Sequence, residues 1–368
     1  MKIQSLHIQN FTVFEDQKFD FCDGINVFIG ANATGKTHVL KTLYCVTLSV
    51  GYGSPLLSGE NQEPLRTFLS DAFRPENRDH SRLLRHDEGD RKYEIDAKGR
   101  LTNGRPWDRG LSSLPRELSS RGIDSGGCSV SSMHQPEKVV FIPPHEMLSA
   151  YEGFAASWER RELSFDKTYY DICRHLEPLV LKKEKLTREA SDLISDLTEI
   201  LGGSVVERNG RFYVKQTSGK LLEAHLLAEG HRKLAMLVRL IANGEIEKDT
   251  VLLWDEPESG LNPRIITVVA QAIRQLAAAG VQVFLATHDY LLTSELSVLA
   301  EYKQKPDVPT KFFAFSRASD DPAAPVAVQS GNLLQDLSDN PILKEFVAHY
   351  DREERLFAAS QREQGADR

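Results

Sequence analysis

The sequence predicts an α/β fold in which a mixed or parallel sheet is flanked by helices. Residues 251–256 (VLLWDE) and 281–289 (VQVFLATHD) contain apolar runs typical of buried strands, and residues 263–280 between them have the amphipathic spacing of a helix. Residues 25–29 (INVFI) form another apolar run, and after a glycine-containing loop residues 36–50 again show helical spacing. Because parallel strands need crossover connections, this alternation of strand and helix indicates a parallel sheet.

The composition is that of a soluble globular protein with a sizeable core. The 368 residues are 40% hydrophobic and 27% charged, which fits one large domain with insertions or two domains. No apolar run approaches the roughly 20 residues that a membrane span needs, and the N-terminus lacks the apolar region of a signal peptide. The net charge of −8 does not indicate nucleic-acid binding, although a local basic patch is compatible with it. We therefore expect a cytoplasmic protein with four reduced, scattered cysteines: Cys22, Cys45, Cys128 and Cys173.

The chain divides by composition and pattern into five expected segments. Two of them form the sheet-bearing core, and the others are an inserted arm or small β region, a helical hairpin, and a C-terminal helix with a polar tail. In chain order the expected boundaries are 1–50 (core), 51–150 (inserted β region), 151–203 (hairpin), 204–320 (core) and 321–368 (C-terminal helix and tail).

Turn-forming residues predict the local structure of the inserted segments. The inserted β region is expected to turn near Lys98-Gly99, and a small antiparallel pair is expected to turn at Asn209-Gly210. Pro178 is expected to begin the second helix of the hairpin, because proline is favoured in the first helical turn.

A phosphate-binding loop is predicted at residues 30–37. The segment GANATGKT fits the pattern G-x-x-x-x-G-K-[ST] and lies between an apolar strand and a helix, which is the context that this motif requires. The backbone N–H groups of such a loop and the positive end of the helix face phosphate. Lys36 would reach the outer phosphates of ATP, and the Thr37 hydroxyl would be a ligand of Mg²⁺. The predicted nucleotide contacts in this segment are Gly30, Ala31, Asn32, Ala33, Thr34, Gly35, Lys36, Thr37 and His38.

Two adjacent carboxylates follow the buried strand at residues 251–254, where they are costly unless a cation or a proton transfer uses them. Asp255 would bind Mg²⁺ directly or through water, because this ion prefers oxygen ligands. Glu256 would act as a general base or orient the attacking water. His288 ends the next strand, and parallel strands deliver their carboxyl ends to one edge, so His288 would hydrogen-bond the γ-phosphate.

The order GANATGKT, LLAEGHRKL, WDEPESGLNP and ATHD resembles the ABC-type ATPase heads of the RecF/SMC and OLD-like branch, and residues 1–50 also look like that branch. The resemblance implies a P-loop NTPase that hydrolyses ATP to ADP and phosphate. It implies that Glu229 and Gly230 in LLAEGHRKL contact nucleotide bound to the other subunit, and that residues 259–263 line the interface. A nucleotide-sandwich homodimer or a higher oligomer is therefore expected. The chain departs from the family at Ala228, where Ser is usual, so one hydroxyl contact to the γ-phosphate is missing.

Two elements of the family pattern have no single candidate in the sequence. The glutamine loop is matched by position at His145-Glu146, or by residue type at Gln135. The aromatic residue that stacks on adenine is unassigned; Phe11 and Phe14 are candidates, but a role in the core is favoured for both.

Three functional classes remain open. The first is an ATPase that controls a nuclease or toxin encoded nearby in a prokaryotic defence system; the absence of a nuclease-like pattern after His288 favours an effector in trans. The second is a DNA repair or recombination ATPase that binds DNA ends or gaps, but the basic segments are interleaved with acids, which favours a solvated face. The third is the ATP-binding subunit of a membrane transporter, which the long stretch between Lys36 and LLAEGHRKL disfavours.

Overall fold

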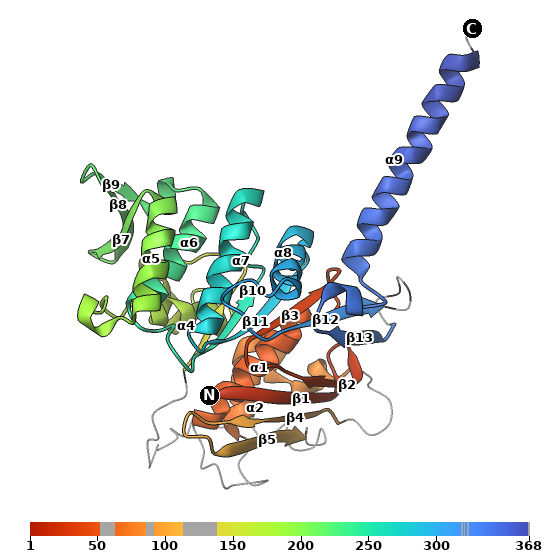
Figure 1. Ribbon diagram of the computed structural model, residues 1–368. Coiled ribbons are helices and arrows are strands. Elements are labelled where there is room, and N and C mark those ends of the chain that lie inside the picture. Colours follow the sequence, from red (N-terminus) through yellow and green to blue (C-terminus); the bar gives the residue numbers. More distant parts are fainter. Residues whose placement is uncertain are drawn as a thin grey trace.

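A six-stranded sheet forms the centre of the protein in the computed structural model, which describes residues 1–51, 63–85, 92–112, 138–317, 319, 321 and 324–366 (Figure 1). The strand order is β13-β12-β3-β11-β10-β6, and every neighbouring pair is parallel except β12 and β13. The predicted parallel sheet is thereby confirmed. The strand bounds are β3 Ile25–Gly30, β6 Val139–Ile142, β10 Val251–Asp255, β11 Gln282–Thr287, β12 Thr310–Arg317 and β13 Val326–Gly331.

A second, four-stranded sheet packs beneath the first, with α1 between the two (Figure 1). Its order is β2-β1-β4-β5 and all its pairs are antiparallel, so strands of the expected insertion complete a sheet that the N-terminus begins. Phe28 of β3 packs in the core between the two sheets. Its neighbours Val27 and Ile29 pack in the core on the other face of the central sheet. The bounds are β1 Lys2–Phe11, β2 Phe14–Asp20, β4 Glu94–Arg100, β5 Pro106–Ser112, α1 Lys36–Gly51 and α2 Glu63–Phe73.

The turn expected near Lys98-Gly99 is wrong. Strand β4 continues through both residues, and the chain reverses after Leu101, where the N–H of Gly104 donates to the Leu101 carbonyl at 2.9 Å. Gly99 instead allows the Trp107 ring to pack against the strand, because a Cβ at Gly99 would lie 2.6 Å from that ring.

Helices cover the other face of the central sheet (Figure 1). Helix α7 crosses between β10 and β11 as predicted, with Pro263 in its first turn and the Asn262 side chain as its N-cap. Helices α5 and α6 pack beside α7 on one side, and α8 packs on the other. The bounds are α3 Phe154–Glu159, α4 Lys167–Leu176, α5 Arg188–Leu201, α6 Glu229–Ala242, α7 Pro263–Ala278 and α8 Tyr290–Glu301.

The predicted start of the second helix of the hairpin, at Pro178, is wrong. Helix α4 ends at Leu176, and α5 begins at Arg188, after Thr187 as N-cap, rather than at Pro178. The intervening chain is fixed to α6, because the Leu181 N–H donates to the Ala242 carbonyl at the end of α6 and Arg239 of α6 donates to the Pro178 carbonyl. Both helices therefore pack on α6.

A small sheet and a long helix complete the described chain. Strands β7 (Gly203–Arg208), β8 (Arg211–Gln216) and β9 (Leu221–Glu223) form an antiparallel sheet, and the turn at Asn209-Gly210 is confirmed. Helix α9 (Pro341–Ala366) projects from the body (Figure 1). Within the described ranges, none of the helices combines the length and the apolar character needed to span a membrane.

Candidate functional site

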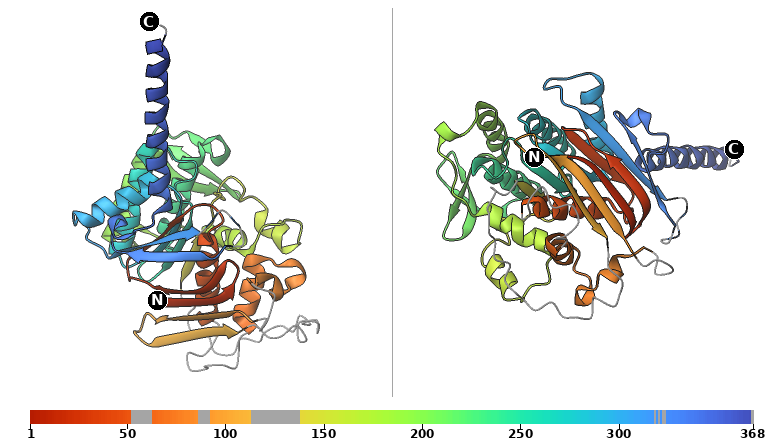
Figure 2. Two further views of the ribbon diagram at one scale, coloured as in Figure 1. Left: turned by 90° about the vertical axis from the view of Figure 1, so that its right-hand side faces the viewer. Right: turned by 90° about the horizontal axis from the view of Figure 1, so that it is seen from below.

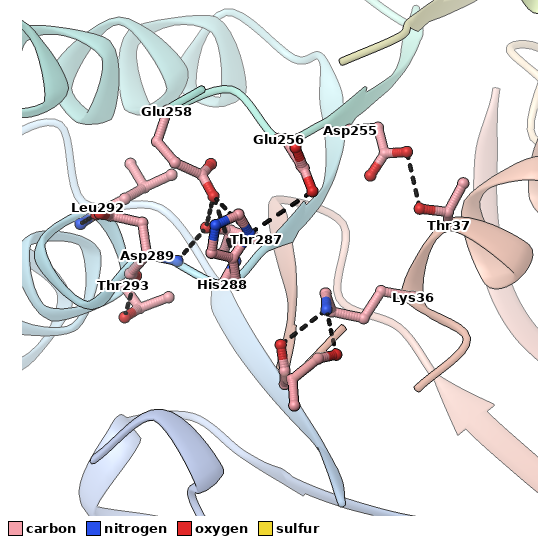
Figure 3. A network of polar contacts seen from close by, with 12 residues as sticks. Lys36, Thr37, Asp255, Glu256, Glu258, Thr287, His288, Asp289, Leu292 and Thr293 are labelled. Carbon is pink, nitrogen blue, oxygen red and sulfur yellow. Dashed lines mark hydrogen bonds and ion pairs between the residues drawn. The ribbon is translucent and has the colours of Figure 1, made fainter. Parts of the chain in front are cut away.

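Three neighbouring strands bring the predicted site residues to one edge of the central sheet (Figure 3). Strands β3, β11 and β10 are adjacent and parallel, so their carboxyl ends share an edge. There β3 leads into the loop before Lys36, β10 ends at Asp255, and β11 is followed by His288. The sheet therefore assembles residues that are more than 200 positions apart in the sequence.

The loop between β3 and α1 encloses the Lys36 ammonium group. Lys36 is the first residue of α1, and its Nζ donates to the carbonyl oxygens of Gly30 at 2.7 Å and Ala31 at 2.8 Å (Figure 3). Burial lowers the pKa of Lys36, whereas the negative charges of Asp255 and Glu256 act to raise it. A buried cation enclosed by the loop fits a phosphate group, which would supply the countercharge.

The loop is held against the turn between β1 and β2. Gly35 has φ +94°, and a Cβ there would lie 2.5 Å from Val13 Cγ2, so this position requires glycine. Arg317 at the end of β12 donates to the Ala33 carbonyl at 2.6 Å and braces the loop from the other side. Sequence reasoning missed Arg317, because only the pairing of β12 with β3 brings it to the loop.

Thr37 and Asp255 are in direct contact. The Thr37 hydroxyl donates to Asp255 Oδ2 at 2.8 Å, and the Asp255 side chain is almost completely buried (Figure 3). Burial raises the pKa of Asp255 to about 6, the hydrogen bond from Thr37 lowers it, and the charge of Glu256 raises it. A buried carboxylate beside a hydroxyl offers the oxygen ligands that Mg²⁺ prefers, so this donor set fits the ion.

The backbone of Glu256 turns its carboxylate away from that of Asp255. Glu256 has φ +49°, its N–H donates to the Ala286 carbonyl at 2.8 Å, and its carbonyl accepts from Lys233 Nζ at 3.1 Å. Lys233 is 1% exposed, and burial lowers its pKa. Glu256 Oε1 lies 3.6 Å from His288 Nδ1 (Figure 3), so two predicted catalytic residues face one another.

Glu258 is a site residue that sequence reasoning missed. Its buried Oε1 accepts from the Thr287 hydroxyl at 2.7 Å and from the His288 N–H at 3.2 Å (Figure 3). Burial raises the pKa of Glu258, and the hydrogen bond from Thr287 lowers it. The available signal was a third acid in the WDEPES segment, placed two residues after Glu256.

The LLAEG segment packs on the loop that follows β10. Helix α6 begins at Glu229, and Ala228 occupies the N-cap without a capping side chain. A Cβ on Gly230 would lie 2.8 Å from Leu261 Cδ2, and a Cβ on Gly260 would lie 2.8 Å from the Glu229 side chain. The two segments that the resemblance assigns to a subunit interface therefore touch within one chain.

The remaining candidates differ in what their side chains contact. Phe11 and Phe14 are fully buried, which places both in the core and removes them as adenine-stacking residues. The His38 ring lies 5.5 Å from the Phe73 ring of α2, and burial lowers the pKa of His38 to about 4. Glu146 forms an ion pair with Arg232 of α6 at 2.5 Å, and Gln135 lies outside the described residues.

The comparisons with known proteins begin with a family model described as "AAA domain, putative AbiEii toxin, Type IV TA system", which matches residues 25–294, more than half of the chain. The DNA replication and repair protein RecF of Lactococcus lactis subsp. lactis (strain IL1403) is 33% identical over 67 residues, covering 17% of this chain and 19% of RecF. RecF of L. lactis subsp. cremoris (strain MG1363) is 39% identical over 49 residues, covering 13% and 14%. The match thus spans less than a fifth of these relatives' length.

A solved structure supports the fold. The crystal structure of the SmcHead bound to the C-winged helix domain of ScpA aligns with a TM-score of 0.50 and 14% sequence identity. The alignment covers 91% of this chain and 99% of that chain. Together with the family match, it confirms the predicted P-loop ATPase head and the resemblance to the RecF/SMC branch.

Proposed function

Because this chain belongs to the AAA-domain family of the RecF/SMC type, we propose that it binds ATP with Mg²⁺ and hydrolyses it to ADP and phosphate. The contact between Thr37 and Asp255 is the observation that carries this proposal. It sets a hydroxyl and a buried carboxylate beside the loop that holds Lys36, as a metal–triphosphate requires.

In this proposal the phosphates and Mg²⁺ are bound by different groups of the site. The N–H groups of residues 30–38 and the Lys36 ammonium hold the phosphates, since the start of α1 adds its positive dipole there. Thr37 and Asp255 hold Mg²⁺, which when bound neutralises charge on the phosphates.

Hydrolysis in this proposal depends on Glu256 and His288. Glu256 is partly exposed and accepts a proton from the attacking water as general base, while its backbone is fixed by Lys233. His288 faces the same space and hydrogen-bonds the γ-phosphate. Glu258 is a positioning residue, because its carboxylate holds the backbone N–H of His288.

The proposal includes a homodimer, or a higher oligomer built from it, around nucleotide. Glu229 and Gly230 lie at the start of α6 against the loop at residues 259–263, and both segments would face ATP bound by the other copy. The start of a helix presents free N–H groups to phosphate. Ala228 supplies no hydroxyl, so closure depends on these backbone groups.

We further propose that this ATPase acts in the cytoplasm and controls a separately encoded nuclease or toxin in a prokaryotic defence system. The family description, which names a toxin of a Type IV TA system, supports a role in such a multi-component system.

Two substitutions test the ATPase proposal on the full chain. Wild-type protein is expected to bind ATP with Mg²⁺ and release phosphate, and Lys36→Ala to lose nucleotide binding. Glu256→Gln is expected to bind ATP normally, hydrolyse it about a hundredfold more slowly and accumulate as a dimer in ATP. Hydrolysis by Glu256→Gln at the wild-type rate would remove the role given to this carboxylate, and indifference of the wild type to ATP would remove the whole proposal.

DNA binding is the second candidate, favoured by the similarity to RecF in a short segment. An exposed run with Lys182, Lys183, Lys185 and Arg188 offers contacts to a phosphate backbone. Affinity for duplex DNA that falls steeply with added salt would support this candidate, and absence of binding at low salt would remove it.

A further inference from the structure

Helix α9 extends far beyond the body of the protein (Figure 2). It has 26 residues, which corresponds to a length of about 39 Å. Its inner end is fastened: Asn340 Oδ1 accepts the N–H groups of Ile342 and Leu343, and the Phe346 ring lies 4.5 Å from the Tyr290 ring of α8. The helix is therefore attached two residues from His288 and then continues outward.

The projecting helix carries an exposed apolar stripe. Beyond Ile342, which packs against the core, six large apolar side chains on it are between 44% and 72% exposed, and several recur at the three- and four-residue spacing of one helical face: Leu343, Phe346, Val347, Tyr350, Leu356 and Phe357. The stripe runs over four turns, far more than the isolated apolar residue that an ordinary surface tolerates. Such a face is typical of a helix that packs against another helix.

We propose that α9 pairs antiparallel with α9 of a second copy of this chain, in a contact that needs no nucleotide. This interface is distinct from the nucleotide sandwich and does not rest on it. The pair would tether two heads through the helices that are anchored beside His288.

The sequence of α9 is complementary to itself in the antiparallel direction. Leu343, Phe346, Tyr350, Glu353 and Phe357 follow the a and d positions of a heptad. With the two-fold axis between residues 351 and 352, Phe346 of one copy lies opposite Phe357 of the other. The same axis sets Tyr350 opposite Glu353, where the phenol hydroxyl can donate to the carboxylate. Phe346 thus meets Phe357, and Glu353, the one acid among these a and d positions, meets a donor.

Glu353, the one acid among the a and d positions, also argues against a parallel helix pair and against a membrane surface. A parallel pair in register would set the two Glu353 carboxylates against one another, and like charges facing across a helix pair are destabilising. An anionic membrane surface would meet the Glu353 carboxylate within the apolar face itself. The charge pattern therefore favours a second α9 in the antiparallel direction.

Sedimentation velocity of the full chain without nucleotide tests the proposal. At tens of micromolar, the wild type is expected to sediment as a dimer and Phe357→Glu as a monomer. Ala358→Glu introduces the same charge one position away, on the outward side of the heptad, and is expected to remain dimeric. Lys36→Ala is also expected to remain dimeric, which separates this interface from nucleotide binding. A monomeric wild type, a dimeric Phe357→Glu or a monomeric Lys36→Ala would each overturn the proposal.

Cysteine cross-linking tests the direction of the pair. An equimolar mixture of Phe346→Cys and Phe357→Cys chains is expected to form, on mild oxidation, a disulfide between positions 346 and 357 that peptide mass spectrometry identifies. Phe357→Cys alone is expected to give no 357–357 disulfide, because antiparallel packing separates these positions. Efficient 357–357 cross-linking, or no 346–357 product from a dimeric mixture, would overturn the antiparallel arrangement.

Discussion

The Glu258 carboxylate holds the backbone of His288: Oε1 accepts the His288 N–H at 3.2 Å, and it also accepts the Thr287 hydroxyl at 2.7 Å. Glu258 follows β10 and His288 follows β11, so one buried side chain ties together the two loops that carry the proposed general base and the phosphate contact. The position of one loop therefore constrains the other.

Replacing Glu258 by Ala is expected to slow hydrolysis more than it weakens ATP binding. The substitution leaves the His288 N–H without this acceptor, a loss worth about 1–3 kcal/mol, which corresponds to roughly a ten- to hundredfold fall in kcat. Glu258→Gln keeps a carbonyl acceptor and should recover much of the rate. Steady-state kinetics would measure both variants; a Glu258→Ala enzyme with wild-type kcat would contradict the positioning role.

Removing the Thr37 hydroxyl is expected to abolish the contribution of Mg²⁺ to ATP affinity. Thr37→Val keeps the side-chain shape but loses the donor to Asp255, whereas Thr37→Ser keeps a hydroxyl. Titration calorimetry with and without Mg²⁺ would show the difference. Wild type and Thr37→Ser should bind ATP more tightly with the ion, and Thr37→Val should bind equally in both conditions. Retention of the full Mg²⁺ effect by Thr37→Val would show that Thr37 is not a ligand.

Gly230→Ala is expected to weaken the nucleotide-dependent dimer while leaving ATP binding by one chain unchanged. The added Cβ would meet Leu261 at 2.8 Å and displace the start of α6 from the loop at residues 259–263. Ala228→Ser, two residues away, is expected to have the opposite effect and strengthen the dimer, because it restores the missing hydroxyl, which can also cap α6, a gain of about 1 kcal/mol in helix stability. Light scattering in ATP, in the Glu256→Gln background, measures both. An undiminished dimer in the Gly230→Ala protein would argue against the assigned interface.

The central sheet was predictable because its strands carry local signals. The apolar runs of β3, β10 and β11 are each followed by polar residues, and a parallel sheet brings their ends together without further information. The sequence could not show that β4 pairs with β1, or that β12 delivers Arg317 to Ala33, because these contacts join distant segments. Glu258 was missed for a related reason: its partners come from another strand.

Stability below neutral pH is expected to depend on His80, the first residue of the 3₁₀ helix His80–Leu83. Its Nε2 is 2.8 Å from the Ser70 hydroxyl and its Nδ1 is 2.5 Å from the Tyr93 hydroxyl. Burial, aided by the charge of Arg66, lowers the pKa of His80 to about 4. The folded protein therefore prefers neutral His80, whereas the unfolded chain takes up a proton near its ordinary pKa of about 6.5.

The sign of the effect follows from that difference. Between about pH 6.5 and pH 4 the unfolded state binds more protons at His80, so the free energy of unfolding falls as the pH falls through this window. We expect His80 to account for a loss of about 2 kcal/mol between neutral pH and pH 5. Urea unfolding of wild type and His80→Gln at both pH values isolates this share, because every other titrating group is common to the two proteins. If both proteins lost the same free energy on acidification, His80 would not be the titrating group.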